Sequence, residues 1–237
     1  MSKASLVALA LALTMGISFL LSDPVCYGAD IRFGGIVPGG TVYKKVESIR
    51  EARYRDLVTQ QTDFSCGAAA LATILKYAYG QQEIDEDIVL AGLFQVSEPE
   101  EVMRKGFSLL DIKNYVETLD MRGRGYRVPA ENLAKVRIPT IALLDIKGYK
   151  HFVVFKKATH EKVYVADPAL GNKIMNMEDF LAGWNGVLFA VIGKGFDLDS
   201  VLLRPREQLT ARNLGSVHAS IKRVDLLDFG FTHADLF

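Results

Sequence analysis

Apolar positions recur with helical spacing in the stretch CGAAALATILKYAYG, which follows Ser65. One face of a helix with this spacing would carry Leu71, Ile74, Leu75 and Ala78. Alanine is the strongest helix former, and glycine commonly follows the last helical turn. We therefore predict a helix that begins at about Ser65 and is ended by Gly80.

Two more helices are predicted before residue 120, at 83–94 and 108–119. In the second, Ser108 and Asp111 resemble an N-terminal capping pair, although the usual partner of the serine is Glu or Gln. The apolar stripe of this helix consists of Leu109, Ile112, Val116 and Leu119. The first part of the domain is therefore expected to be helical.

Beyond residue 120 the pattern changes to short, β-rich apolar segments bounded by Gly, Pro and polar turns. The predicted strands are 124–128, 138–146, 151–158, 162–168 and 186–193. A short helix is predicted at 176–184, between the last two of them. Helices followed by strands predict an α+β fold class, with N-terminal helices packed on an antiparallel sheet.

Two segments flank the predicted domain, which we place at residues 51–196. Residues 29–50 are glycine-rich and then strand-like, so we expect an arm that leads into a first edge strand. Residues 197–237 form a C-terminal extension of mixed composition, which we interpret as a helical or partly ordered appendage.

The first 28 residues have the pattern of a secretory signal peptide. Lys3 provides a short positive region, Leu6–Leu21 is almost wholly apolar, and Pro24 would break a helix. Small residues follow at the expected cleavage point, and a cut after Gly28 fits better than one after Ala29. The prediction is an exported, periplasmic protein; the alternative is an uncleaved membrane anchor, since the apolar run is only slightly short of a spanning helix.

Composition fits one domain with a substantial hydrophobic core. Apolar residues make up 49% of the 237-residue chain, and 28 basic residues balance 28 acidic ones. A net charge of zero gives no indication of nucleic-acid binding or of an acidic membrane surface.

Cysteine usage narrows the chemistry further. Cleavage of the signal peptide would remove Cys26 and leave Cys66 as a single cysteine. In an exported protein such a thiol is either free and reactive or linked to another molecule. The alternative is a buried cysteine that serves as a small hydrophobic side chain.

Cys66 lies at the predicted N-terminus of the alanine-rich helix. Unpaired N–H groups and the helix dipole favour a negatively charged thiolate there, and the thiolate is the nucleophile. Gly67 follows without a side chain, which we expect to leave room for a substrate. This position favours a reactive thiol.

A cysteine nucleophile needs a general base, and four histidines are available. His151 opens a predicted strand directly after a turn, where catalytic side chains are often found. The other three, His160, His218 and His233, are interpreted as surface residues.

The orienting carboxylate is predicted from the strand pair that follows. If residues 151–168 form a hairpin that turns near 159–161, His151 and Asp167 lie opposite each other or about one pair removed. We expect their side chains on the same face, within hydrogen-bonding reach. The alternative is an ordinary turn aspartate, because Pro168 follows Asp167.

An oxyanion donor is expected just before the helix. A glutamine amide at residue 60 could reach back to the helix N-terminus and, with the Cys66 backbone N–H, hold the oxyanion of a tetrahedral intermediate. Gln61 is an equally good candidate on spacing alone.

Three stretches of this chain, QQTDFSCGAAALATIL, KGYKHFVVF and VYVADPALG, resemble the motifs of the bacteriocin-processing, double-glycine peptidases, which form cysteine-peptidase family 39 and have a papain-like fold. The resemblance covers roughly residues 55–195 and is specific, because three motifs occur in order. Within the family, the chain most resembles exported members associated with functional-amyloid secretion.

The resemblance implies a role for each candidate residue. The oxyanion glutamine of the family lies six residues before the nucleophile, which selects Gln60. The family's Cys-Gly pair at the helix start matches Cys66 and Gly67. Its general base opens a strand, as His151 does, and its aspartate comes 16 residues later before a proline, as Asp167 does.

The chain departs from the best-known members, which are N-terminal domains of ABC exporters. We find no nucleotide site: the segment Ile192–Gly195, IGKG, lacks the upstream glycine of a P-loop. The prediction is an exported cysteine endopeptidase that needs no ATP, no metal and no cofactor, and acts on a protein or peptide substrate. A non-cleaving binding module and an amidase or acyl transferase are the alternatives.

The arm suggests one further hypothesis. It carries two Gly-Gly pairs, and the family cuts after such pairs. Val37 precedes the second pair, Gly39–Gly40, at the site where family leaders carry an apolar residue. The arm could therefore enter the active-site groove as an inhibitor or be cleaved itself; the alternative is a flexible spacer.

Overall fold

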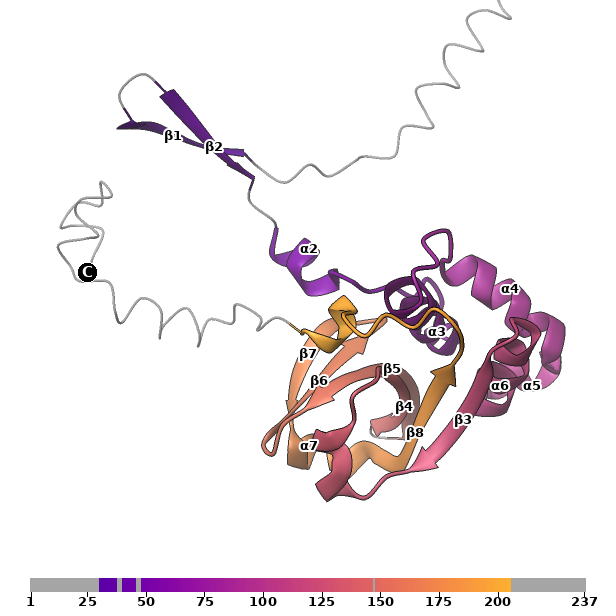
Figure 1. Ribbon diagram of the computed structural model, residues 1–237. Coiled ribbons are helices and arrows are strands. Elements are labelled where there is room, and N and C mark those ends of the chain that lie inside the picture. The colour runs from indigo at the N-terminus through magenta and orange to yellow at the C-terminus, as the bar shows by residue number, and fades with distance from the viewer. Residues whose placement is uncertain (1–29, 38–39, 46–47, 147, 206–237) are drawn as a thin grey trace, which may run out of the picture. The chain divides into compact units, whose positions relative to one another are not determined.

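The structure is a computed structural model that describes residues 30–37, 40–45, 48–146 and 148–205 (Figure 1). The chain divides into two units, residues 1–49 and 50–237, each of which is described by itself. The predicted signal peptide, Gly39 and residues 206–237 lie outside the described residues.

The first unit contains an antiparallel hairpin of β1, Asp30–Val37, and β2, Gly40–Lys45. The two strands form their own two-stranded sheet. The prediction of an arm that leads into a first edge strand is corrected in one respect: the arm itself contains a strand, β1, which pairs with β2. The physical reason is that the first Gly-Gly pair, at 34–35, is accommodated as an irregularity between Phe33 and Val37 instead of preventing strand formation.

The second unit is an α+β domain, as the sequence predicts. Its helices are α2 (Ile49–Tyr54), α3 (Cys66–Ala78), α4 (Glu86–Val96), α5 (Pro99–Lys105), α6 (Leu109–Thr118) and α7 (Met177–Gly183). Its strands are β3 (Arg122–Arg127), β4 (Thr140–Ile146), β5 (Tyr149–Ala158), β6 (Lys162–Asp167), β7 (Gly171–Asn176) and β8 (Trp184–Ile192). Short 3₁₀ turns occur at Ala130–Lys135 and Val201–Leu203.

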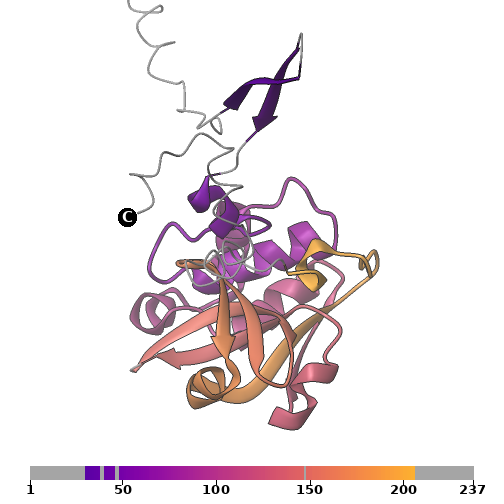
Figure 2. The same ribbon diagram turned by 90° about the vertical axis from the view of Figure 1, so that its left-hand side faces the viewer.

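The six strands form one sheet in the order β3-β8-β4-β5-β6-β7, and every neighbouring pair is antiparallel. Helices α3 to α6 gather on one side of this curved sheet and α7 lies on the other (Figures 1 and 2). Each side has its own apolar cluster, and neighbouring residues of one strand enter opposite clusters: Val154 the α3 side and Val153 the α7 side. Because both faces are covered, the central strands carry continuous apolar runs, such as Phe152–Phe155 in β5.

Helix α3 is buried on almost every side, which explains its unusual composition. All five alanines of the helix and Leu71 are completely inaccessible to solvent, and Thr73 is buried as well. Small side chains let the helix lie close to β5. The Thr73 hydroxyl donates to the Ala69 carbonyl and accepts from the Val58 N–H, so this one polar core group is satisfied.

Helix caps agree with the sequence pattern. Ser108 and Asp111 form a reciprocal capping box at α6, with Asp111 in the place usually taken by Glu or Gln. Asp85 caps α4 by accepting from the Ile88 N–H. Helix α5 and strand β7 have no counterpart in the predicted pattern, because both are short and carry few apolar residues.

The start of the predicted C-terminal extension packs against the domain. The Asp197 N–H donates to the Ala78 carbonyl, and the Ser200 hydroxyl donates to the Tyr77 carbonyl at the end of α3. Leu202 is completely buried in the α3-side cluster. These residues therefore belong to the domain, whereas the sequence pattern predicts that the domain ends at residue 196.

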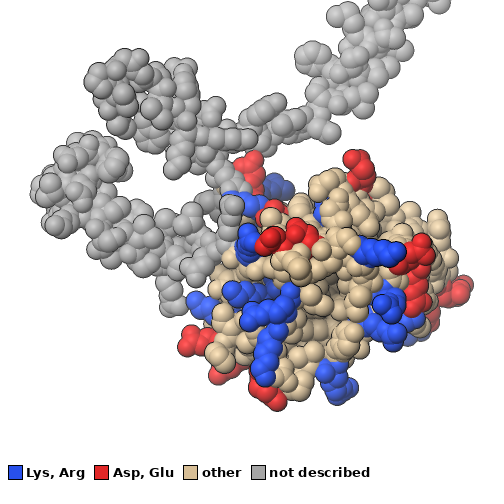
Figure 3. Space-filling model, viewed as in Figure 1, with Lys and Arg blue, Asp and Glu red and all other residues tan. Residues whose placement is uncertain are grey.

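Charges on the surface are mixed. The face seen in Figure 3 carries Lys and Arg side chains interspersed with Asp and Glu, in keeping with the net charge of zero. Among the described residues, no helix is both long enough and apolar enough to span a bilayer.

Candidate active site

Cys66 is the first residue of α3 and is a free cysteine, 7% exposed. Ser65, the N-cap residue, makes no side-chain hydrogen bond to the helix; its hydroxyl donates to the Thr62 carbonyl and accepts from the Thr62 N–H. The first turn contains no acidic residue. Helix N–H groups next to the thiol therefore stay uncapped by this serine, and no acidic side chain of that turn opposes a negative charge there.

Gly67 has a different role from the predicted one. It is buried, and a Cβ added to it would lie 3.2 Å from Phe152 Cδ2 and 3.3 Å from Ile112 Cδ1. The missing side chain lets the helix N-terminus approach strand β5 and does not make room for a substrate. Because Phe152 follows His151, this close packing brings the Cys66 end of α3 to the start of β5.

His151 and Asp167 form a buried pair, as the hairpin prediction expects. Asp167 Oδ1 lies 2.8 Å from His151 Nε2, and the two residues are 2% and 4% exposed. In the pairing of β5 with β6, Val154 lies opposite Ala166. Continuing this register places Asp167 opposite Val153, which is two residues from His151 and on the same face of β5. The predicted offset of about one pair is therefore the one observed.

A β-bulge produces this register. Strand β5 has one extra residue, Lys156, between the pairs Phe155↔Val165 and Lys157↔Tyr164. Side chains alternate with a period of two, so extending the pairs nearest the turn without a bulge would put Asp167 on the face opposite His151. The bulge at Lys156 is what turns the carboxylate toward the imidazole.

Asp167 is also fixed by the turn that follows it. Its Oδ1 accepts from the backbone N–H groups of Ala169 and Leu170, both at 3.0 Å. The three-residue loop closes at Gly171, which has a φ of +84° and whose added Cβ would lie 2.8 Å from the Arg53 carbonyl oxygen. Asp167 is thus both a turn aspartate and the partner of His151, and the turn orients its carboxylate toward the imidazole.

The electrostatics of the pair favour a charged imidazole. Burial alone would lower the pKa of His151, but the hydrogen bond to Asp167, the neighbouring Cys66 and the charges of both outweigh burial and raise it to about 9. Burial would raise the pKa of Asp167, yet His151, the Leu170 N–H and Lys173 together lower it. His151 Nδ1 is buried without a hydrogen-bond partner, so this is the ring nitrogen left for the thiol.

Gln60 and Gln61 differ clearly in their surroundings. Gln60 is half-buried, and its backbone N–H donates to the carbonyl of Pro168, which is the residue after Asp167. Gln61 is exposed, and its N–H donates to both carboxylate oxygens of buried Glu86 at 2.8 and 3.0 Å. The Gln60 amide donates to the Thr62 carbonyl at 3.2 Å. The structure therefore ties Gln60 to the Asp167 turn and leaves the Gln61 side chain in solvent.

A buried lysine and an asparagine, both missed in the sequence, hold the segment that carries Gln60. Lys156 Nζ donates to Asn172 Oδ1 at 2.7 Å, and Asn172 Nδ2 donates to the carbonyls of Arg53 and Arg55. Burial lowers the pKa of Lys156 to about 8, and the charge of Asp56 opposes part of the shift. The bulge residue is thus also the anchor of the segment that leads to Gln60.

Tyr149 is a further residue that sequence reasoning missed. It lies two positions before His151 and therefore on the same face of β5. This spacing could have indicated from the sequence that Tyr149 lies near His151. Its ring stacks on the imidazole with centroids 6.1 Å apart, and its hydroxyl donates to the Asp63 carbonyl at 3.0 Å. Burial raises the pKa of its phenol, and so do the negative charges of Cys66, Asp63 and Asp167.

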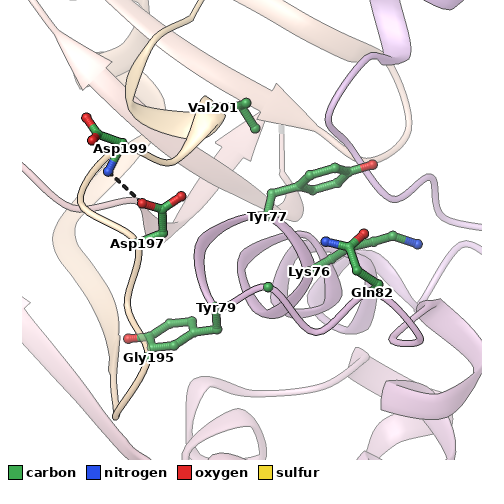
Figure 4. A pocket seen from close by; sticks show the side chains of 9 residues that line it. Lys76, Tyr77, Tyr79, Gln82, Gly195, Asp197, Asp199 and Val201 are labelled. Carbon is green, nitrogen blue, oxygen red and sulfur yellow. Dashed lines mark hydrogen bonds between the residues drawn. The ribbon is translucent and has the colours of Figure 1, made fainter.

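Away from Cys66, the described residues offer a cavity but no metal site. Among the described residues, no cluster of three or more His, Cys, Asp or Glu side chains could hold a metal ion. A cavity of about 290 Å³ lies at the C-terminal end of α3 and is lined by Lys76, Tyr77, Gln82 and Asp197 among others (Figure 4). It is one helix length, about 20 Å, from Cys66. We place the functional site by its chemistry, at the N-terminal end.

Comparison with known proteins gives a consistent result. A family model described as the peptidase C39 family matches residues 55–194. The chain is 50% identical to the "Probable functional amyloid protease FapD" of Pseudomonas aeruginosa, over 92% of this chain and 96% of the relative. It is 45% identical to the protein of the same name from Pseudomonas fluorescens, over 94% of this chain and 98% of the relative.

A solved structure is similar as well. It is a double glycine motif protease from an AMS/PCAT transporter in complex with the leader peptide, 27% identical, with a TM-score of 0.49. The match covers 58% of this chain and 91% of that one.

Proposed function

Because the chain belongs to the peptidase C39 family and is a cysteine peptidase, we propose that Cys66 is its nucleophile, His151 its general base and Asp167 the residue that orients the histidine. Gln60 completes the site as an oxyanion donor. One observation carries this assignment: the buried His151–Asp167 hydrogen bond of 2.8 Å beside a free cysteine at a helix N-terminus. The proposed binding-module and acyl-transfer alternatives give way to the peptidase, since the family is one of peptidases.

The reaction begins with a proton transfer from the Cys66 thiol to His151 Nδ1, the nitrogen that Asp167 does not engage. The thiolate attacks the carbonyl carbon of the scissile peptide bond, and an S–C bond forms. The negative oxygen of the tetrahedral intermediate accepts hydrogen bonds from the Cys66 N–H and the Gln60 amide. The free N–H groups of the α3 end supply the first of these donors.

The imidazolium then gives its proton to the leaving amine, so the C–N bond breaks and a thioester remains on Cys66. Water, deprotonated by His151, attacks the thioester and releases the carboxylate product and the thiol. A pKa of about 9 keeps His151 protonated at neutral pH when it faces the thiolate. Asp167 stabilises that charge through the bond to Nε2.

We also propose that the peptidase is exported and acts in the periplasm on a protein of a secreted amyloid system. Support for export is the signal-peptide pattern of residues 1–28. Support for the substrate class is the relatives' printed name, functional amyloid protease, together with 50% identity over nearly the whole chain. The substrate is a polypeptide that must lie extended across the Cys66 end of α3.

Cleavage of candidate secreted proteins tests this proposal. The full chain and its Cys66→Ala and His151→Ala variants are incubated with each candidate, and the products are identified by mass spectrometry. His160→Ala is the matched control, because His160 is an exposed histidine in the turn of the same hairpin. We expect new termini with wild type and with His160→Ala only. Equal cleavage by Cys66→Ala would refute the assignment.

A further inference from the structure

Tyr149 connects the two walls of the active site. Its backbone begins strand β5, which carries His151, and its hydroxyl reaches the carbonyl of Asp63, three residues before Cys66. The hydrogen bond joins residues 86 positions apart in sequence. The side chain therefore runs from the strand that holds the base to the loop that leads into the nucleophile.

The ring covers the imidazole at the same time. It stacks on His151 with an interplanar angle of 27°, while the residue as a whole is 51% exposed. One side of the ring thus shields His151, and the rest faces solvent. Tyr149 therefore forms a bar from β5 to Asp63 beside His151, and about half of the residue is exposed to solvent.

The bar is held at both ends by weak or local interactions. The phenol–carbonyl bond lies in an exposed position, where water readily replaces it. The β4–β5 turn that precedes Tyr149 is short: Ile146 pairs with Tyr149, and the Gly148 N–H donates to the Asp145 side chain. Loss of the phenol–carbonyl bond would therefore remove no backbone pairing of β5.

We propose that Tyr149 is a specificity-determining residue that limits the width of the molecules that reach Cys66. The bar between β5 and Asp63 admits narrow groups to the thiol and excludes wide ones. This proposal rests on the proposed function, since it takes Cys66 as the reactive group. It adds a residue that sets access, separate from the residues that perform the chemistry.

Pairs of thiol reagents with the same reactive group but different width test the proposal. N-ethylmaleimide and N-pyrenylmaleimide are reacted with the full chain, modification of Cys66 is followed by peptide mapping, and both rates are normalised to glutathione. The proteins are wild type, Tyr149→Phe and Tyr149→Ala. Tyr126→Ala is the matched control, because Tyr126 is a tyrosine of β3 with a similar exposure, 49%.

We expect the wide-to-narrow rate ratio to rise about three- to tenfold in Tyr149→Phe, which loses one hydrogen bond. It should rise further in Tyr149→Ala, which loses the ring, and stay unchanged in Tyr126→Ala. The rate with N-ethylmaleimide should change by less than about twofold in Tyr149→Phe, because phenylalanine keeps the ring that stacks on His151 and a narrow reagent passes in both proteins.

The outcomes separate this proposal from the proposed function. An unchanged ratio in Tyr149→Ala would overturn the role in access. Equal loss of both rates, with a shifted pH profile, would overturn it as well, because Tyr149 would then act by positioning His151. If N-ethylmaleimide reacts equally with wild type and His151→Ala, the proposed nucleophile itself fails, whatever the ratio.

Discussion

The two ends of helix α3 differ in what converges on them. At the N-terminal end, Cys66 lies beside the buried His151–Asp167 pair, and the Gln60 N–H donates to the carbonyl of Pro168, in the turn after Asp167. At the C-terminal end there is a hollow of about 290 Å³, and the two aspartates that line it, Asp197 and Asp199, are exposed. The comparison teaches that convergence of buried, mutually perturbed groups marks the reactive end better than empty volume does.

The largest expected effect comes from removing the base at the reactive end. We predict that His151→Ala lowers kcat/KM by about 10²- to 10⁴-fold, the usual contribution of a general base. His160→Ala should stay at the wild-type value. Steady-state cleavage of a peptide that spans the mapped site measures kcat/KM of both variants. Comparable values would contradict the claim that His151 acts at the reactive end and His160 does not.

Asp167 should matter next. We predict that Asp167→Ala lowers kcat/KM by about ten- to a hundredfold, because it removes a hydrogen bond to a charged imidazole. Asp167→Asn should have a smaller effect, since an amide can still accept from Nε2.

The pH profile of these variants has a definite sign. The carboxylate raises the pKa of His151, which is about 9 in wild type, so wild-type kcat/KM should fall as pH rises through about 9, where the imidazolium loses its proton. Without the carboxylate the pKa of His151 falls, and this basic limb should move to lower pH in both Asp167 variants. A limb that stays near 9 would show that Asp167 does not act on His151.

The bulge supports the reactive end from a distance. Lys156→Met would leave Asn172 Oδ1 without its donor, and we predict a loss of about 1–3 kcal/mol in the free energy of unfolding. Turnover should fall as well, because Lys156 holds the segment that leads to Gln60 and occupies the bulge that orients Asp167.

Lys157→Met is the matched control, since Lys157 is the next residue and is exposed. We expect its unfolding free energy to lie within about 0.5 kcal/mol of wild type. Urea denaturation of both variants, followed by fluorescence of Trp184, is the measurement. Equal stability of the two would mean that the lysine does not hold the bulge.

The smallest effect is expected at the hollow end. Lys76→Ala should change kcat/KM by less than about twofold, because Lys76 lies on the cavity wall one helix length from Cys66. The same cleavage assay measures it. A tenfold loss would mean that the hollow binds the substrate and that the contrast between the two ends is drawn wrongly.

The sequence predicts the fold class and the three candidate residues Cys66, His151 and Asp167 because their signals are local. Helical spacing locates α3, apolar runs locate the central strands, and the short turn between β5 and β6 brings His151 and Asp167 near each other. Gln60 is favoured over Gln61 by family resemblance, and the structure adds that the Gln61 side chain is exposed.

Other features depend on contacts between distant segments and leave no local signal. The bulge at Lys156 decides which face Asp167 occupies, yet nothing in the apolar run of β5 marks it. Gly67 was interpreted as space for a substrate, whereas Phe152, which lies 85 residues further along the chain, fills that space. The Tyr149–Asp63 bond also joins two segments that only the fold brings together.

The most direct test of the central claim is the rate at which Cys66 is alkylated by iodoacetamide at pH 7 in wild type and in His151→Ala. The account predicts that wild type reacts at least about tenfold faster than glutathione, because a paired imidazolium keeps the sulfur as thiolate. His151→Ala should lose that advantage. Equal rates in the two proteins, no faster than glutathione, would contradict the claim that this end of α3 is the reactive one.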